Sequence, residues 1–234
     1  MDISAILLAG GESSRFGSDK AFHKLEDQSF LQKTLEAISK VANQVIISVD
    51  TIEKAERVKL EVQNPNVELH IDKIRGGPAV SIKECVQEAI YDRIIVLPVD
   101  IPYVTEEDIS QLVDVLDDSE FSIYRIRDNF TMLFFGTWKK VISRVNNPFR
   151  VREFLRKAKS CIIYNLSEYG TLININTPEL IPSTKPERVK NISKERIHIP
   201  SFQEGCTGII EEYDFWRNYG DMRRTLRRHY SECF

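Results

Sequence analysis

ISAILLAGGESSRFGSDKA, residues 3–21, begins with a nearly continuous apolar run and passes directly into a glycine-rich loop. The run from Ile3 to Ala9 is typical of a strand that is buried on both faces of a sheet. The loop contains neither GxxxxGK[ST] nor GxGxxG, so it is neither a Walker A loop nor a dinucleotide fingerprint. The segment therefore predicts a buried first strand followed by a phosphate- or base-binding turn of another kind.

The loop combines backbone and side-chain groups that suit a nucleotide. Gly10 and Gly11, directly after the strand, let backbone amides approach a phosphate or a base closely. Arg15 and Lys20 follow in the same loop, where their charges can neutralise a triphosphate. The alternative interpretation is a strand-to-helix turn that carries two solvated cations. The combined spacing of glycines, arginine and lysine favours the nucleotide site.

Downstream, the chain alternates between apolar runs and amphipathic segments. We expect strands at residues 44–50, 93–100, 160–164 and 171–175, one ending at 72, and two within 120–135 that turn at 127–129. We expect helices at residues 30–42, 51–62, 78–90 and 149–158, and one that Thr105 caps. This order predicts an α/β fold with a Rossmann-like, doubly wound, mainly parallel sheet. We place one domain at residues 1–182 and a short C-terminal extension of unknown role at 183–234.

Composition narrows the class of protein. The hydrophobic fraction of 42% and charged fraction of 29% are ordinary for a globular protein, and the net charge of −3 gives no reason to expect a nucleic-acid partner. No apolar stretch approaches the roughly 20 residues that span a bilayer, and no basic segment precedes the first apolar run. We therefore expect a soluble, cytoplasmic protein without a membrane partner. No CxxC pair occurs among the cysteines, which suits a reducing compartment: Cys85, Cys161, Cys206 and Cys233. The histidines show no spacing typical of metal ligands: His23, His70, His198 and His229.

Four blocks of the sequence carry a resemblance to one family. LAGGESSRFGSDKA resembles the signature LAGGxSxRxGxDKA of the molybdenum cofactor guanylyltransferases, and GGP at 76–78, PVDIP at 98–102 and NINTPE at 174–179 follow in that family's order. The resemblance implies a sheet of the nucleotidyltransferase type. It also implies transfer of GMP from GTP to the phosphate of molybdopterin, with release of pyrophosphate.

The residues by themselves point to part of this chemistry. Asp100 comes just after an expected buried strand, and a carboxylate there is a fitting ligand for Mg²⁺, the cofactor that we expect. The alternative for Asp100 is a helix cap or a turn held by local amides. The transfer that the resemblance implies needs no general base, because the acceptor phosphate is already an anion; positioning and charge stabilisation are enough.

The resemblance extends these assignments residue by residue. It implies catalytic roles for Arg15, Lys20 and Asp100, with Asp100 as the metal ligand. The implied nucleotide-binding residues are Leu8, Ala9, Gly10, Gly11, Lys20, Asp50, Asp72, Gly77 and Asp100, and the acceptor-side candidates are Asn174 and Asn176. The alternative for the two asparagines is a strand-end turn.

The chain departs from the family pattern at two places. Where the family usually continues GPLAGI, residues 77–82 read GPAVSI, and Asp50 stands where the family often has asparagine. For Asp50 an exposed helix cap is an equally good interpretation. These departures leave open a transferase for another nucleotide or phosphorylated acceptor, and a non-catalytic nucleotide-binding protein.

The end of the chain carries a basic cluster. Arg223, Arg224, Arg227 and Arg228 would form one face of a helix, because residues four apart lie on the same side. Such a face could contact a protein partner. A solvated helix surface is the alternative.

Overall fold

The computed structural model describes residues 2–11, 16–17, 19–74, 76–127 and 129–200. Its longer strands are β1 (Ile3–Leu8), β4 (Gln44–Val49), β5 (Val67–Ile71), β6 (Arg93–Pro98), β7 (Phe121–Ile126), β8 (Asn129–Trp138), β9 (Ser160–Leu166) and β10 (Ser193–His198). Two short strands, β2 (Lys24–Leu25) and β3 (Gln28–Ser29), form a separate antiparallel pair. The α-helices are α1 (Phe30–Ser39), α2 (Ile52–Glu61), α3 (Pro78–Glu88), α4 (Glu106–Val113), α5 (Lys139–Ser143) and α6 (Arg152–Lys157). Short 3-10 helices cover η1 (Lys20–Phe22), η2 (Gly170–Leu172) and η3 (Pro178–Leu180).

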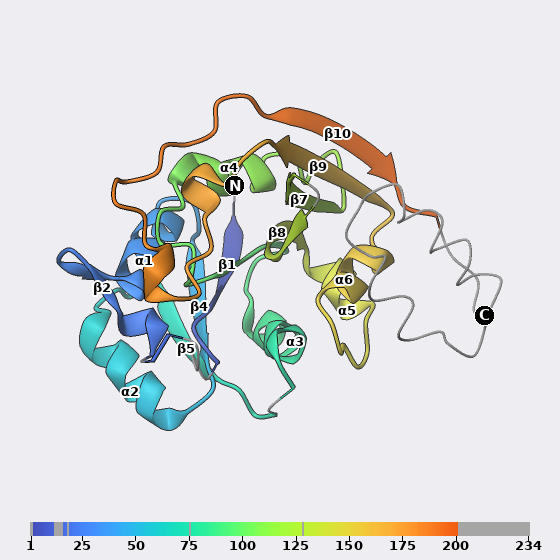
Figure 1. Cartoon of the computed structure of the whole chain (residues 1–234). Helices are drawn as coiled ribbons and strands as arrows, with labels where there is room; N and C mark the ends of the chain where they lie inside the picture. The colour runs from blue at the N-terminus through green and yellow to red at the C-terminus, as the bar shows by residue number, and fades with distance from the viewer. Residues whose placement is uncertain (1, 12–15, 18, 75, 128, 201–234) are drawn as a thin grey trace, which may run out of the picture.

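The eight longer strands form one mixed, mostly parallel sheet in the order β10-β9-β7-β8-β6-β1-β4-β5 (Figure 1). The strands β6, β1, β4 and β5 are parallel to their neighbours in that group, and β7 is parallel to β9. The strand β8 runs antiparallel to both β6 and β7, and β10 runs antiparallel to β9. The predicted α/β class with a mainly parallel sheet is confirmed.

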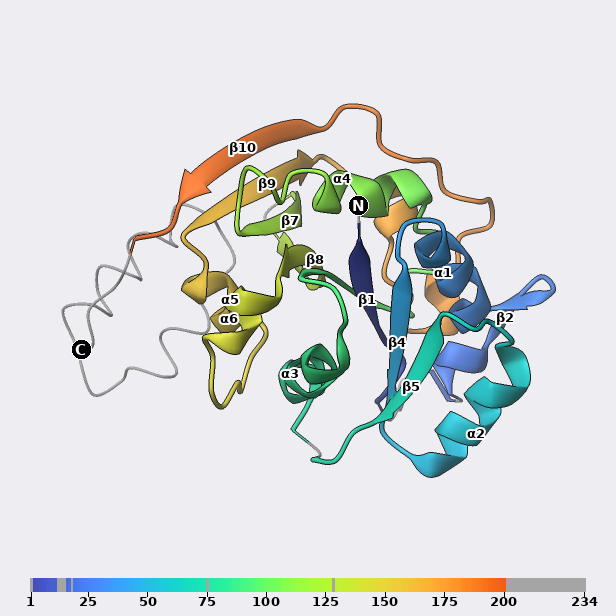
Figure 2. The ribbon, with the colours of Figure 1, turned by 180° about the vertical axis from the view of Figure 1, so that it is seen from behind.

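Helices cover both faces of the sheet. Successive side chains of a strand point to opposite faces, so they pack against opposite helical layers. In β1, Ala5 and Leu7 pack in the hydrophobic cluster that also contains residues of α1, α2 and α4. Ile6 and Leu8 pack in the opposite cluster, with residues of α3, α5 and α6. Figure 2 shows α3, α5 and α6 together on one side of the sheet. This two-sided burial explains the nearly continuous apolar run of the first strand.

Local sequence signals set the starts of several helices. Ser29 and Gln32 form a capping box at α1, and Thr105 and Asp108 form another at α4, where the sequence predicts the cap. Pro78 occupies the first turn of α3, where its missing amide hydrogen is not needed. No helix in the described part of the chain is long and apolar enough to cross a membrane.

The prediction of a strand at residues 171–175 is wrong. Residues 171–175 form no strand; the 3-10 helix η2 and an irregular segment replace it. Gly170 has φ +50°, and the amide of Ile175 donates to the carbonyl of Asp100 at 2.8 Å, so this backbone bonds to a loop and not to a neighbouring strand. The apolar residues that suggested a strand are buried all the same, including Leu172 and Ile175.

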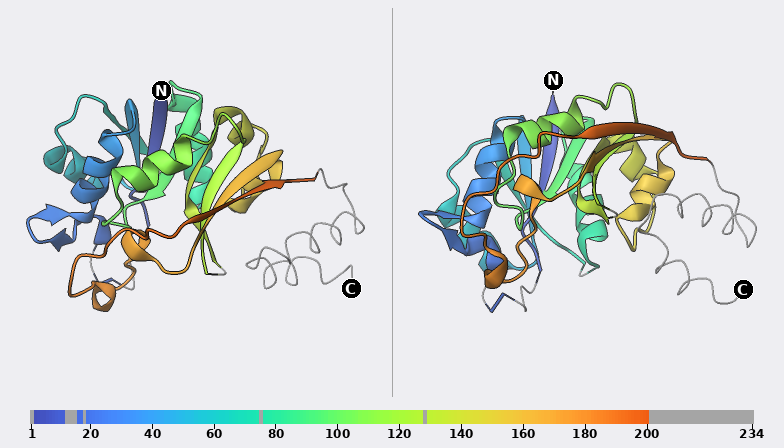
Figure 3. Two further views of the ribbon diagram at one scale, coloured as in Figure 1. Left: turned by 90° about the horizontal axis from the view of Figure 1, so that it is seen from above. Right: turned by 45° about the horizontal axis from the view of Figure 1, so that its top comes forward.

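The strand β10 belongs to the extension and has no counterpart among the expected elements. Figure 3 shows it lying along β9 at the end of the sheet. Its sequence, SKERIH, lacks the alternation of apolar residues that reveals a strand, because Ile197 is the one residue of β10 that is buried. Residues 183–200 also contact α4: Arg188 donates from Nε to Asp108 Oδ1 at 2.7 Å and from Nη2 to Gln111 Oε1 at 2.6 Å. The boundary near residue 182 stays a prediction.

Candidate active site

A cleft of about 740 Å³ opens at the carboxyl ends of β1, β4, β5 and β6. Ligands of open α/β sheets bind at this edge, because the loops after the strands converge there. In Figure 1 this edge is the end of β1 that points away from the N-terminus. The lining residues are Leu8, Gly10, Gly11, Asp19, Lys20, Ser48, Asp50, Thr51, Lys54, Asp72, Gly77, Pro78, Ser81, Pro98, Val99, Asp100 and Leu133.

Lys20 and Asp100 form the charged centre of the cleft. Lys20 Nζ donates to Asp100 Oδ2 at 2.5 Å and to Asn176 Oδ1 at 3.2 Å, and Asn174 Nδ2 donates to Asp100 Oδ1 at 3.1 Å. Lys20 is the first residue of η1, and Asp19 caps this turn by accepting from the amide of Ala21. Asp100 is only 6% exposed, so its charge is held by these donors and not by water.

The same group of side chains suits a hard divalent cation. Asp100, Asn174 and Asn176 offer only oxygen ligands of the kind that Mg²⁺ and Mn²⁺ bind. Asn174 Oδ1 is buried and has no hydrogen-bond partner among the described residues. A buried acceptor without a partner is costly, and a cation or a donor that arrives with a ligand would satisfy it. The residues present therefore fit the metal that the sequence predicts.

A second cluster holds the glycine turn after β1. The amide of Gly11 donates to Asp50 Oδ2 at 3.1 Å, and Lys54 Nζ donates to the carbonyl of Gly11 at 2.7 Å. Lys54 also forms ion pairs with Asp50 at 2.8 Å and Asp19 at 3.5 Å. Burial alone would raise the pKa of Asp50, but the bonds from Lys54 and Gly11 outweigh it and lower the pKa. The ionised side chain of Asp50 therefore fixes the glycine turn. The next residue, Thr51, is the N-cap of α2.

Sequence reasoning did not find Lys54. It lies in the first turn of α2, four residues after Asp50, and that spacing is the available signal. The signal is weak, since many exposed lysines on helices share it.

A third cluster surrounds Asp72, just after β5. Ser48 Oγ donates to Asp72 Oδ1 at 2.7 Å, and Ser81 Oγ donates to Asp72 Oδ2 at 2.6 Å. Ser81 is one of the residues at which this chain departs from GPLAGI, so the departure supplies a hydrogen-bond donor inside the cleft. Gly77, the cap of α3, has φ +78° and ψ −179°, a conformation that glycine adopts readily and other residues rarely do.

The structure brings most of the proposed site residues together in this cleft. Of the nucleotide-binding residues expected from the sequence, Ala9 alone is absent from the lining; it is buried, and its amide donates to the carbonyl of Ser48 at 2.9 Å. Asn174 and Asn176 contact the lining through Asp100 and Lys20. Arg15 and the basic cluster at 223–228 lie outside the described residues.

Comparison with known proteins identifies relatives of this chain. Residues 5–231 match the family model described as MobA-like NTP transferase domain. A Geobacillus protein named "Probable molybdenum cofactor guanylyltransferase" is 32% identical over 112 residues, 47% of this chain. This match spans only 56% of the Geobacillus relative, a little over half its length. A Natranaerobius thermophilus protein of the same name is 25% identical over 198 residues, which cover 76% of this chain and 92% of that protein.

Solved structures share the fold at low sequence identity. Molybdopterin-guanine dinucleotide biosynthesis protein A from Archaeoglobus fulgidus has a TM-score of 0.61 at 18% identity, over 76% of this chain and 94% of that one. A nucleotidyl transferase from Methanothermobacter has a TM-score of 0.63 at 19% identity, over 76% and 93%. A Mycobacterium tuberculosis protein in complex with manganese has a TM-score of 0.52 at 18% identity, over 61% and 74%.

Proposed function

Because this chain belongs to the MobA-like NTP transferase family, we propose that it transfers GMP from GTP to the phosphate of molybdopterin and releases pyrophosphate. Membership of this family supports nucleotidyl transfer as the type of reaction. The identities of the nucleotide and of the acceptor are what we propose.

The observation that carries the proposal is the contact between Lys20 and the nearly buried Asp100 beside the glycine turn. A metal-dependent transferase needs an anionic oxygen ligand and a cation for the phosphates within reach of one another. Lys20, with Arg15, would move toward the β- and γ-phosphates and stabilise the departing pyrophosphate. Asp100, with Asn174 and Asn176, would hold Mg²⁺, which when bound lowers the charge on the reacting phosphates.

In this reaction an oxygen of the acceptor phosphate attacks the α-phosphorus of GTP. The bond between the α-phosphorus and the bridging oxygen to the β-phosphate breaks, and its electron pair leaves with pyrophosphate. No proton transfer is required, so the site needs no catalytic histidine or serine. The work of the protein is to align the two phosphates and to balance their charges.

Guanine would occupy the side of the cleft formed by the turn before α3. It presents an acceptor at O6 and donors at N1 and N2. Backbone amides at Gly10 and Gly77 can donate without side-chain obstruction, and Asp72 can accept. A base that lacks these groups would leave buried polar atoms unpaired, so it would bind more weakly.

A nucleotide panel tests the proposal. Pyrophosphate release is measured with GTP, CTP, ATP and UTP, each with Mg²⁺ and molybdopterin, for the wild type and Asp100→Asn. We expect release with GTP only, loss of release in the variant, and GTP binding at least about tenfold tighter than ATP, equivalent to about 1.4 kcal/mol. Release with another nucleotide alone would overturn the guanine assignment and keep the transferase.

Near-normal turnover of Asp100→Asn would overturn the role of Asp100. Nucleotide binding without turnover in the wild type would identify a binding protein and remove the proposed activity.

A further inference from the structure

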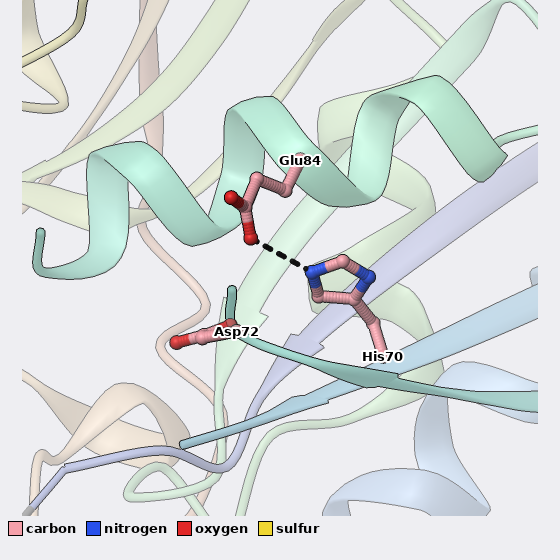
Figure 4. Close-up of side chains that lie close together, drawn as sticks. All are labelled: His70, Asp72 and Glu84. Atoms are coloured by element: carbon pink, nitrogen blue, oxygen red, sulfur yellow. Dashed lines mark hydrogen bonds and ion pairs between the residues drawn. The ribbon is translucent and has the colours of Figure 1, made fainter. Parts of the chain in front are cut away.

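A separate group of metal-ligating side chains lies between β5 and α3. His70 is in β5 and Asp72 follows it by two residues, so the two side chains project to the same face of the sheet. Glu84 projects from α3 toward them (Figure 4), and the potential ligand atoms of these residues all lie within 4.8 Å of one another. His70 Nε2 lies 3.1 Å from Glu84 Oε2.

The orientation of the His70 ring is fixed from its other side. Glu88, one turn after Glu84 on α3, contacts His70 Nδ1 at 2.7 Å. Metal-binding histidines commonly donate the second ring nitrogen to a carboxylate, which fixes the tautomer and raises the basicity of the ligand nitrogen. With Nδ1–H donated to Glu88, Nε2 is the ring nitrogen that would bind a metal, on the side of Glu84. His70 is 3% exposed, so water does not separate these groups.

The charges at this place do not balance. Asp72 and Glu84 are half-buried and Glu88 is exposed beside them, and within the described ranges of the chain no lysine or arginine side chain forms an ion pair with any of the three. His70 is their only cationic partner there, and only when it is protonated. Half-buried carboxylates without enough counter-charge are costly, and a cation would offset this cost.

We propose that His70, Asp72 and Glu84 bind a divalent transition-metal ion of the Zn²⁺ or Co²⁺ type, at a site separate from the one at Asp100. One imidazole nitrogen and two carboxylate oxygens are a common ligand set for zinc, whereas Mg²⁺ prefers oxygen ligands and water. Ligand distances of about 2.0–2.2 Å require these atoms to approach one another by about 1 Å or a little more. Asp72 is held by Ser48 and Ser81, so this movement falls mainly to Glu84, whose side chain is partly exposed.

The hydrogen bonds already present are compatible with the metal. An ionised carboxylate has about four lone-pair directions. Asp72 uses two of them for Ser48 and Ser81, and Glu84 Oε2 accepts from the amide of Lys73 at 3.0 Å. These donors would hold the two carboxylates in place beside the metal, as supporting residues do in metal sites. Asp72 also lines the cleft where we place guanine, and the test below is made without a nucleotide, so its outcome is separate from that of the nucleotide chemistry proposed above.

The test is a Co²⁺ titration of the full chain, followed by its visible absorption and by calorimetry. Saturating Mg²⁺ is present throughout, and the titration is repeated in Asp100→Asn so that the site at Asp100 cannot account for the signal. We expect both proteins to bind one equivalent of Co²⁺, with a visible absorption band that indicates a low coordination number of the ion. We also expect Zn²⁺ to displace the bound Co²⁺.

The variants identify the ligands. We expect Glu84→Gln and His70→Gln each to weaken Co²⁺ binding by at least about 100-fold, and Glu88→Gln to weaken it by about 10- to 100-fold. Glu68→Gln, an exposed glutamate of the same strand, is the matched control and should bind as the wild type does. His70 is buried, so if His70→Gln does not fold, the half-exposed Glu84 decides the question. Absence of a stoichiometric Co²⁺ band in the wild type, or unchanged affinity in Glu84→Gln, would overturn the proposal.

Discussion

Lys20 places an amine against a carboxylate that is almost completely buried, and the two groups depend on each other. Without a substrate, Lys20 balances the charge of Asp100. With a triphosphate in the cleft, the amine has a stronger anion to bind. Under the proposed function the carboxylate would then be released to a metal ion, and the ion pair would be exchanged when the substrate binds.

Lys20→Ala should reduce turnover far more than it reduces stability. We expect kcat to fall by at least about 100-fold, because a cation that stabilises charge in the transition state is lost. The melting temperature should fall much less, since Asp100 keeps its bond from Asn174 and removal of the partly exposed Lys20 side chain opens the carboxylate to water. Lys24→Ala, an exposed lysine nearby, is the control. Losses of activity and melting temperature in proportion would show that Lys20 has a structural role only.

Gly77→Ala should act through the backbone. A methyl group there would meet nothing within 4 Å, but φ +78° with ψ near 180° is a region that residues other than glycine avoid. We expect a loss of about 1–3 kcal/mol in the free energy of unfolding, measured by urea denaturation, and weaker nucleotide binding. Gly10→Ala is the comparison: its φ lies outside the left-handed region and its added methyl makes only ordinary contacts, so its unfolding should hardly change. Equal effects of the two substitutions would contradict this explanation.

The sequence predicts the site residues that lie in contiguous motifs and misses those that the fold brings together. Gly10, Gly11 and Lys20 share one loop, and Asp100 ends an apolar strand, so local patterns reveal them. His70 and Glu84 are 14 residues apart and meet only because α3 packs over β5. No local spacing encodes that crossing. For this reason the lack of ligand spacing among the histidines does not exclude the proposed metal site.

At the level of secondary structure, a strand that is buried on both faces is easy to predict from its apolar run. A strand that buries little of its surface is hard to predict. The strands β1, β4 and β6 are buried along almost their whole length, so their apolar runs predict them well. The strand β10 buries Ile197 among exposed or half-buried residues, and its sequence resembles a loop. Residues 171–175 show the opposite case, because apolar side chains are buried there without a strand ladder.

Glu120 ties three elements together and makes their packing sensitive to acid. It precedes β7 and accepts from Arg144 at 2.6 and 2.9 Å and from the amide of Lys159 at 2.9 Å. The hydrogen bonds from Arg144 are the largest cause that lowers the pKa of Glu120 to about 2. A carboxyl whose pKa is lower in the folded state stabilises the fold above its unfolded pKa, and this contribution disappears as the pH falls through the folded pKa.

We therefore expect the contribution of Glu120, about 1–2 kcal/mol, to be present at neutral pH and to disappear between about pH 4.5 and pH 2. The measurement is the free energy of unfolding against pH for the wild type and Glu120→Gln, with Glu168→Gln as an exposed control. The two curves of wild type and Glu120→Gln should converge at low pH. A constant difference over the whole pH range would show that the ionised form of Glu120 does not stabilise the fold.

Over the whole molecule, the extension and the cleft are joined through one sheet. Residues 183–200 add β10 to β9, place Ile197 and Ile199 in the hydrophobic cluster beneath α3, α5 and α6, and attach Arg188 to α4. The segment with Asn174 and Asn176 lies between β9 and this extension in the chain, so this segment is held from both ends. We propose from these contacts that residues 183–200 unfold together with residues 1–182, although the sequence places a boundary between them.

Ile197→Ala tests this cooperativity. The side chain is 5% exposed, and its truncation should cost about 2–4 kcal/mol because it leaves a cavity in the core. If the extension and the main sheet form one unit, the variant melts in a single transition at lower temperature, and hydrogen exchange speeds up in β1 as much as in β10. Lys194→Ala, exposed on the same strand, should match the wild type. Faster exchange in β10 alone, with β1 still protected as in the wild type, would show that the extension opens on its own. The segment with Asn174 and Asn176 would then be anchored from one end only.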